Sequence, residues 1–132
     1  MREGELCTML VKNFHPLESY VHLEMTKNGD ERDVPLSKKA IRWMTHLCED
    51  KAKDEKIIPL KANTLCEYFC DARRAAGLEG LVFHDTRHEA ATLLSKKLSN
   101  LLELSAVTGH RSLKALKRYY NPTPADLASK LD

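Results

Sequence analysis

The sequence predicts a single α+β domain that is mainly helical and carries one small antiparallel β-hairpin. Apolar residues recur at helical spacing along most of the chain. Residues 20–26 differ, because apolar and polar residues alternate there and lead to Asn28-Gly29, the strongest short signal for a hairpin turn. A length of 132 residues suffices for one hydrophobic core. We therefore expect one domain over residues 1–132, with residues 121–132 as its C-terminal tail.

The composition argues against a membrane protein. Hydrophobic residues make up 42% of the chain and charged residues 30%, as in ordinary globular proteins. No apolar run is long enough to cross a bilayer. The first ten residues also lack the basic-then-apolar pattern of a secretory signal. We expect a cytoplasmic protein with no membrane partner.

The four cysteines predict neither disulfide bonds nor a metal centre. They contain no CxxC pair, and thiols stay reduced in the cytoplasm. Cys66 and Cys70 are one helical turn apart, but no second pair of ligands stands at a zinc-like spacing. We expect no metal and no cofactor. The other two cysteines are Cys7 and Cys48.

Positive charge is concentrated in the C-terminal part of the chain. The net charge is +2, with 13 basic and 14 acidic residues in positions 1–80 but 8 basic and 5 acidic residues in positions 81–132. Such an excess is compatible with a phosphate-bearing partner, although many solvated helices show the same imbalance.

The first half of the chain predicts the end of a helix, a hairpin and two further helices. Residues 2–12 have apolar residues at helical spacing and predict the end of a helix. Lys27 falls at the tip of the predicted hairpin, where its plainest role is to keep a sheet edge soluble. Ser37 can cap a helix over residues 38–50, with Met44 on its buried face and Trp43 in the core or at its rim. Another helix runs from about residue 63 and stops at Gly77.

The second half, after a short connection, predicts helices throughout. Thr86 and Glu89 fit a capping box, so a helix should begin at residue 85 or 86 and run to about residue 98. His84 and Arg87 then stand at the mouth of that helix, where backbone N–H groups favour anions. A helix over residues 100–107 should stop at Gly109, and a third should span residues 112–120. Pro124 suits the first turn of a short terminal helix.

Two adjacent tyrosines close the third predicted helix. At about 100° per residue, Leu113, Leu116 and Tyr120 share one narrow face of that helix. Tyr119 is turned about a quarter circle away from it. Tyr120 is therefore the better core residue and Tyr119 the better candidate to face a cleft, unless both simply pack the helix.

Taken together, these motifs resemble the catalytic domain of the tyrosine recombinases, the phage-integrase family. Its Arg-x-x-Glu/Asp helix end is matched by residues 2–5, and its hairpin lysine by Lys27. The His-x-x-Arg box is matched by residues 84–87, and the Gly-His pair by residues 109–110. The family's nucleophilic tyrosine follows that histidine by nine residues, which is the position of Tyr119. The resemblance covers nearly the whole chain.

The resemblance implies a role for each matched residue in the cleavage of DNA. Arg2 and Arg87 would clamp the scissile phosphate, because guanidinium groups match phosphate geometry. Tyr119 would be the nucleophile, with His84 accepting its proton. Lys27 would protonate the departing 5′ oxygen as general acid. Two residues not yet named complete the set: His110 as a donor to the phosphate and Glu5 as a support for the arginines and the histidine.

The resemblance also implies the product and the partners. A 3′-phosphotyrosyl link would store the bond energy, so strands could be rejoined without ATP or a metal. Arg111 adds a further DNA-phosphate contact beside His110. We expect double-stranded DNA as partner, a tetramer on DNA, and a monomer or weak oligomer without it. The family's N-terminal DNA-clasping domain is absent from these 132 residues. His88 is expected to be a structural hydrogen-bonding residue rather than a catalyst.

Three alternatives to a recombinase stay open. A type IB topoisomerase-like enzyme would nick and close DNA by the same chemistry but without synapsis of two sites. A DNA-binding prophage relic would keep the fold without activity, although the complete set of motif residues argues against decay. A helical interaction module that binds no nucleic acid is the third.

Overall fold

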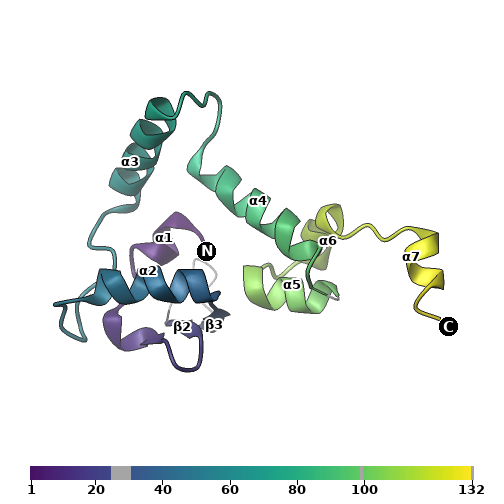
Figure 1. Ribbon diagram of the computed structural model, residues 1–132, viewed down its shortest axis with the longest axis horizontal. Coiled ribbons are helices and arrows are strands. Elements are labelled where there is room, and N and C mark those ends of the chain that lie inside the picture. Colours follow the sequence, from purple (N-terminus) through teal and green to yellow (C-terminus); the bar gives the residue numbers. More distant parts are fainter. Residues whose placement is uncertain (25–30, 99, 132) are drawn as a thin grey trace. The chain divides into compact units, whose positions relative to one another are not determined.

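The computed structural model describes residues 1–24, 31–98 and 100–131. Its two compact units cover residues 1–87 and 88–132, and each is considered separately. Among the described residues, the first unit contains three short strands and the second contains helices, and helix α4 contributes residues to both units (Figure 1). The elements are α1 (Glu3–Leu6), η1 (Val11–Asn13), β1 (Phe14–His15), β2 (Tyr20–Leu23), β3 (Arg32–Pro35), α2 (Lys38–Cys48), α3 (Ala62–Ala75), α4 (Phe83–Ser95), α5 (Leu101–Thr108), α6 (Leu113–Leu116), η2 (Lys117–Tyr119) and α7 (Pro124–Ala128).

The three strands form one antiparallel sheet in the order β1-β2-β3. Val21 lies opposite Val34, and Leu23 lies opposite Arg32. Val21 and Leu23 are buried while His22 between them is half-exposed, as the period of two in a strand requires. The predicted antiparallel strands are therefore confirmed, whereas the Asn28-Gly29 turn and Lys27 lie outside the described residues.

The core of the first unit joins the sheet, α2 and the segments around them. Ser37 caps α2 as predicted, because its Oγ accepts a hydrogen bond from the backbone N–H of Ala40 at 3.2 Å. Met44 is buried against the sheet, but the prediction for Trp43 is wrong, since 58% of that residue is exposed. One position along a helix turns a side chain by about 100°, so Trp43 points away from the face that buries Met44. The buried core residues are Met9, Val21, Leu23, Val34, Met44 and Ile57.

The helix predicted over residues 2–12 is confirmed only in its first turn. Helix α1 ends at Leu6, and after a turn the chain pairs with residues 53–57 at Leu10 and then enters the 3₁₀-helix η1. The backbone of Met9 accepts from Ile57 at 2.9 Å, and Val11 donates to Glu55 at 3.0 Å. These long-range bonds, together with the burial of Ile57, replace the hydrogen bonds that a continued helix would have made.

Helix α4 begins earlier than the sequence predicts. Asp85 accepts a hydrogen bond from the backbone N–H of Val82 at 2.8 Å, and this contact starts the helix at Phe83. The predicted capping box of Thr86 and Glu89 is wrong, since Thr86 lies inside the helix and its hydroxyl donates to the carbonyl of Phe83. As a result His84 lies in the first turn and Arg87 one turn further. The helix ends at Ser95 rather than near residue 98, and residues 96–98 form a turn.

In the second unit, α5 has the predicted ends. The side chain of Asn100 accepts from the N–H groups of Leu102 and Glu103 at 2.9 and 3.0 Å, and Gly109 stops the helix with a φ of 70°. The next helix is not continuous to residue 120, because it tightens from α6 into the 3₁₀-helix η2 at residue 117. The short helix α7 starts at Pro124, as predicted. The core here consists of Ala91, Leu104 and Leu116.

None of the helices in the described part of the chain has the length and apolar character that a bilayer-spanning helix needs. Among the same residues, no group of three or more potential ligands is positioned to hold a metal ion. All four cysteines are free thiols.

Candidate active site

A buried carboxylate organises the basic residues of the first unit. Glu5 is only 4% exposed, and the guanidinium of Arg32 donates to its two oxygens at 3.0 and 3.1 Å. The backbone N–H of Arg2 donates to the same carboxylate at 2.7 Å, and the Arg2 side chain adds a contact at 3.3 Å. Glu5 therefore links the start of α1 to the first residue of β3 by charge-assisted bonds.

The ionisation of Glu5 reflects these contacts. Burial alone opposes the charged form, but the hydrogen bonds from Arg32 and from the backbone of Arg2 outweigh it, so the pKa of the Glu5 carboxyl lies below its usual value. Glu5 is thus a carboxylate at neutral pH, with two guanidinium groups around it.

Arg87 acts electrostatically on the same group as Arg2 and Arg32, the amino group of Met1. Burial lowers the pKa of the Met1 amino group, the positive charges of Arg87, Arg32 and Arg2 lower it further, and Glu5 opposes them. The charge of Arg87 thus acts on the amino end of the chain, as do the charges of Arg32 and Arg2. Arg87 is 7% exposed. The pairing of Arg2 with Arg87 on one phosphate stays a prediction.

Of the other residues predicted for this part of the site, His84 is exposed in the first turn of α4. Lys27 lies outside the described residues.

In the second unit, Tyr119 is hydrogen-bonded to a histidine. Its hydroxyl meets Nδ1 of His88, a residue of α4 that lies 31 positions earlier in the chain. The two ring centres are 6.2 Å apart. The guanidinium of Arg118 lies over the tyrosine ring, 5.1 Å from its centre. Tyr119 and Tyr120 are both half-buried, because the change to a 3₁₀-helix at residue 117 breaks the regular 100° rotation on which their predicted separation depended.

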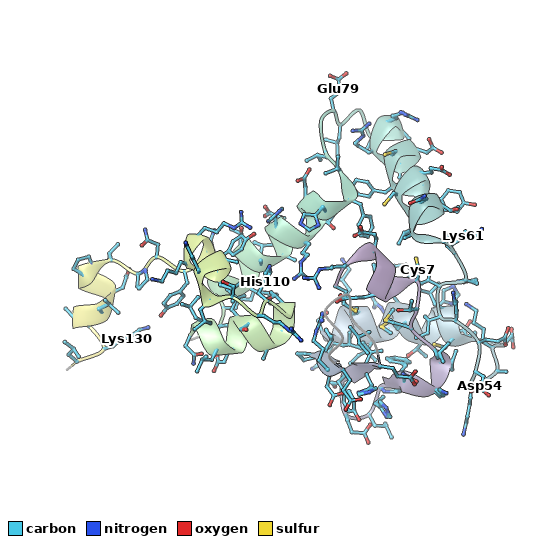
Figure 2. All side chains as sticks on the ribbon, turned by 180° about the vertical axis from the view of Figure 1, so that it is seen from behind. Cys7, Asp54, Lys61, Glu79, His110 and Lys130 are labelled. Atoms are coloured by element: carbon cyan, nitrogen blue, oxygen red, sulfur yellow. The ribbon has the colours of Figure 1, made fainter. Side chains whose placement is uncertain are left out.

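His110 lies where the chain passes from α5 to α6 (Figure 2). Its Nδ1 is 2.8 Å from the hydroxyl of Thr108, and that hydroxyl donates its single proton to the carbonyl of Leu104 at 2.6 Å. Thr108 must therefore accept from His110, so the proton of a neutral His110 resides on Nδ1. The hydroxyl of Ser105 also donates to the backbone carbonyl of His110. Neutral His110 can present only an acceptor at Nε2, and donation to a phosphate from Nε2 requires the doubly protonated ring.

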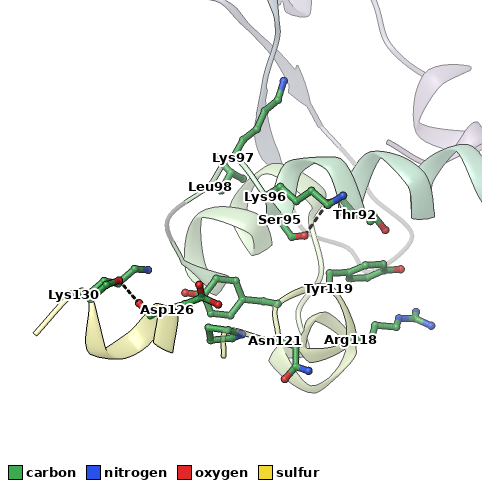
Figure 3. Close-up of a pocket in the computed structure, with 13 residues that line it drawn as sticks. Thr92, Ser95, Lys96, Lys97, Leu98, Arg118, Tyr119, Asn121, Asp126 and Lys130 are labelled. Carbon is green, nitrogen blue, oxygen red and sulfur yellow. Dashed lines mark hydrogen bonds between the residues drawn. The ribbon is translucent and has the colours of Figure 1, made fainter. Parts of the chain in front are cut away.

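Tyr119 borders an open hollow of about 810 Å³ in the second unit (Figure 3). Basic side chains contribute to its lining, and among the described residues Asp126 is the one acidic residue there. Figure 3 shows Arg118 and Tyr119 on neighbouring positions of this wall. The excess of positive charge suits an anionic ligand. The basic residues of the lining are Lys96, Lys97, Arg118 and Lys130.

The structure thus brings predicted site residues together in two groups. Arg2, Glu5 and Arg87 share the first unit, and His110 and Tyr119 share the second, where their ring centres are 6.4 Å apart. Arg111, next to His110, is exposed.

Three contributors were absent from the predicted site. Arg32 is 27 residues from Glu5, and no local pattern connects the two. His88 was expected to be structural, and its contact with Tyr119 spans two helical segments. Thr108 could have been found, because the left-handed Gly109 turns the chain back between Thr108 and His110.

Comparison with known proteins identifies the family of this mainly helical domain. The phage integrase family matches residues 1–126, and the chain belongs to this family. A shufflon-specific DNA recombinase of Escherichia coli is 34% identical over 133 aligned positions, which cover 100% of this chain and 34% of that protein. Tyrosine recombinase XerA of Saccharolobus solfataricus is 28% identical, over 98% of this chain and 44% of that protein. The chain therefore spans less than half the length of these relatives.

Solved structures support the same fold. A crystal structure of XerA recombinase superposes with a TM-score of 0.77 at 17% identity, over 98% of this chain and 51% of that one. A lambda integrase tetramer bound to a Holliday junction gives a TM-score of 0.70 at 24% identity, over 91% of this chain and 38% of that one. The α+β fold of a tyrosine-recombinase catalytic domain, predicted from the motifs, is confirmed.

Proposed function

We propose that the full-length protein cleaves and rejoins DNA at specific sites through a 3′-phosphotyrosyl intermediate. The observation that carries this proposal is the hydroxyl of Tyr119, which is bonded to a histidine and lies beside a basic hollow. A tyrosine positioned only for packing would need neither feature. The enzyme would be a DNA strand transferase of the bacterial or phage cytoplasm, where its substrate lies.

The arginines of the first unit serve the scissile phosphate. Phosphoryl transfer spreads negative charge over the nonbridging oxygens, and fixed guanidinium groups stabilise that charge. Arg2 and Arg87 supply these groups, and Glu5 restrains Arg2 by its contacts with the backbone and the side chain. His110 and Arg111 contribute phosphate contacts from the second unit.

Tyr119 attacks the phosphorus, and the 5′ oxygen leaves. The tyrosine proton must be removed during attack, for which the family pattern assigns His84, and the 5′ oxygen must gain a proton, for which it assigns Lys27. A 5′-hydroxyl from another strand then attacks the phosphotyrosine and restores the phosphodiester. No external energy source is required, because each step exchanges one phosphodiester for another.

The partners follow from the reaction. Double-stranded DNA is the substrate. Exchange between two sites requires two protomers for each site, so the assembly on DNA is a tetramer. Without DNA the protein is a monomer or weak oligomer. The lambda integrase relative is described as a tetramer on a Holliday junction, which supports this assembly. The tail of residues 121–132 would dock onto a neighbouring protomer of that tetramer.

A suicide duplex tests the proposal. The DNA site is recovered by selecting random-sequence duplexes that the full-length protein binds, and a nick near the cleavage position lets the short 5′-hydroxyl fragment diffuse away. We expect a covalent protein–DNA adduct that is absent in Tyr119→Phe and present in Tyr120→Phe. The reverse pattern would refute the choice of nucleophile. Adduct formation without synapsis of two sites would favour a topoisomerase-like enzyme, and binding without any adduct would favour an inactive relic.

A further inference from the structure

A histidine other than His84, to which the family pattern assigns the proton of the nucleophile, is hydrogen-bonded to Tyr119. Nδ1 of His88 is hydrogen-bonded to the hydroxyl of Tyr119. His88 lies inside α4, and its carbonyl accepts from the hydroxyl of Thr92 at 3.0 Å. The imidazole of His88 therefore extends from a regular helix, and the helix backbone restricts the directions in which Nδ1 can point.

The second histidine near Tyr119 does not offer its Nδ1 for the same task. The ring centre of His110 is 6.4 Å from that of Tyr119. Its Nδ1 already donates to Thr108, whose only hydroxyl proton is committed to the carbonyl of Leu104. In a neutral His110 Nδ1 thus carries the proton and only Nε2 could accept one, whereas Nδ1 of His88 is already hydrogen-bonded to the hydroxyl that must lose its proton.

We infer that His88 is the immediate proton acceptor for Tyr119 during strand cleavage. This inference rests on the proposed function, since it assigns one step of that reaction. The neutral tautomer of His88 with its proton on Nε2 leaves a lone pair on Nδ1, and Tyr119 donates to it. His88 contacts a reacting atom and is therefore a catalytic residue rather than the structural histidine expected from the sequence.

The step balances in atoms and charge. The O–H bond of Tyr119 breaks and its proton passes to Nδ1 of His88, which becomes an imidazolium. The freed electron pair of the tyrosine oxygen forms the new bond to phosphorus, and the bond from phosphorus to the 5′ oxygen breaks. That oxygen takes a proton from the general acid, which is Lys27 in the proposed mechanism.

Transfer of the proton and attack must occur together. A phenol is a much weaker acid than an imidazolium, so complete transfer before attack is unfavourable. The guanidinium of Arg118, 5.1 Å from the centre of the tyrosine ring, stabilises the negative charge that develops on that side chain. A preformed hydrogen bond to His88 provides the path for the proton as the oxygen–phosphorus bond forms.

Two substitutions separate proton acceptance from positioning. In His88→Asn an amide group occupies about the place of Nδ1, so the bond to Tyr119 can persist while proton acceptance is lost. We expect the single-turnover rate of adduct formation on the suicide duplex to fall by about 10²-fold or more, with DNA affinity unchanged within about twofold. In His88→Ala, added imidazole should restore part of the rate, which a folding defect would not allow.

The pH dependence supplies a readout that a structural role would not change. The wild-type cleavage rate should rise with pH as the acceptor histidine loses its proton, and His88→Asn should lack this rising limb. His46→Asn is the matched control, because His46 is an exposed histidine on α2, outside the proposed site, and its Nδ1 lies 3.1 Å from the carboxylate of Glu49. It should retain the wild-type rate and profile.

The outcomes distinguish this inference from the proposed function. A rate within about threefold of wild type in His88→Asn, with the rising limb intact, would overturn the inference and leave strand cleavage standing. A slow His88→Ala beside a fully active His88→Asn would mean positioning alone and would also overturn it. The absence of any adduct with the wild-type protein would overturn the proposed function, and the inference with it.

Discussion

Nδ1 of His110 donates a hydrogen bond to the hydroxyl of Thr108 across 2.8 Å, over the left-handed turn at Gly109. This contact orients the imidazole and determines which of its nitrogens can meet a phosphate. Because Thr108 is buried, its hydroxyl has little freedom to serve any other ring position.

Replacing Thr108 by Val should therefore impair cleavage without abolishing DNA binding. The valine has a similar shape but cannot accept from His110, so the ring loses its orientation. We expect the single-turnover rate of adduct formation to fall about tenfold, which corresponds to about 1.4 kcal/mol. Thr108→Ser retains the hydroxyl and should stay within about threefold of wild type. Equal rates for the two variants would contradict this role of Thr108.

Glu5 and Arg32 should make a large contribution to the stability of the first unit. Glu5→Gln leaves the guanidinium of Arg32 next to a neutral amide in a nearly buried position, and breaking a buried ion pair costs about 3 kcal/mol. We expect urea unfolding to show a loss of this size. Glu31→Gln is the control: its carboxylate is 75% exposed and contacts His22 at 3.8 Å, so the change should be under about 0.5 kcal/mol. Similar losses in both variants would show that burial of the pair is unimportant.

The same pair predicts part of the acid sensitivity. The pKa of Glu5 is lower in the folded protein than its usual value, so the unfolded chain binds a proton at Glu5 more readily. The stabilisation is fully present above the ordinary carboxyl pKa and is lost as the pH falls through the lowered folded value. Melting temperatures measured against pH should decline toward acid less steeply in Glu5→Gln than in wild type. Parallel declines would exclude Glu5 as a source of the acid sensitivity.

Gly109 should matter for both stability and activity, unlike a glycine of the same conformation elsewhere. Its φ of 70° and that of Gly77, 68°, are left-handed values that favour glycine, so alanine at either position should lower the free energy of unfolding by about 1 kcal/mol. Gly109→Ala should also slow cleavage, because Gly109 directs the chain between Thr108 and His110. Gly77→Ala should not. An equally slow Gly77→Ala would point to a general effect of lowered stability.

The sequence predicted best those features that depend on neighbouring residues. The ends of α5 were correct because Asn100 and Gly109 act within one turn of the helix. The start of α4 was misassigned because two consecutive caps, at residues 82–85 and 86–89, are both compatible with the local sequence. The spacing of residues in the sequence does not show which of the two caps forms.

Features that depend on distant residues were not predictable in this way. The helix expected over residues 2–12 stops early because residues 53–57 bond to its second half. The contact of Glu5 with Arg32 and that of Tyr119 with His88 join residues 27 and 31 positions apart. No periodicity links such residues, so only the folded chain reveals Arg32 as the main partner of Glu5 and His88 as the partner of the tyrosine.

Lys27 can be tested as the general acid with a modified substrate. Lys27→Ala should slow cleavage of the ordinary duplex by about 10²-fold, since the 5′ oxygen would then leave without a proton. When sulfur replaces the bridging 5′ oxygen, the leaving group needs no proton, and the variant should cleave nearly as fast as wild type. Lys53→Ala, at an exposed lysine, is the control and should match wild type on both duplexes. A defect that persists with the sulfur substrate would assign Lys27 another role.

The central claim is that Tyr119 forms the covalent bond to DNA, and peptide mapping of the adduct tests it most directly. Trypsin cuts after Arg118 and Lys130, so residues 119–130 form one peptide that contains both Tyr119 and Tyr120. After nuclease digestion of the DNA, fragment-ion mass spectrometry should locate the remaining nucleotide phosphate on Tyr119. A phosphate on Tyr120, or on a residue outside this peptide, would contradict the account.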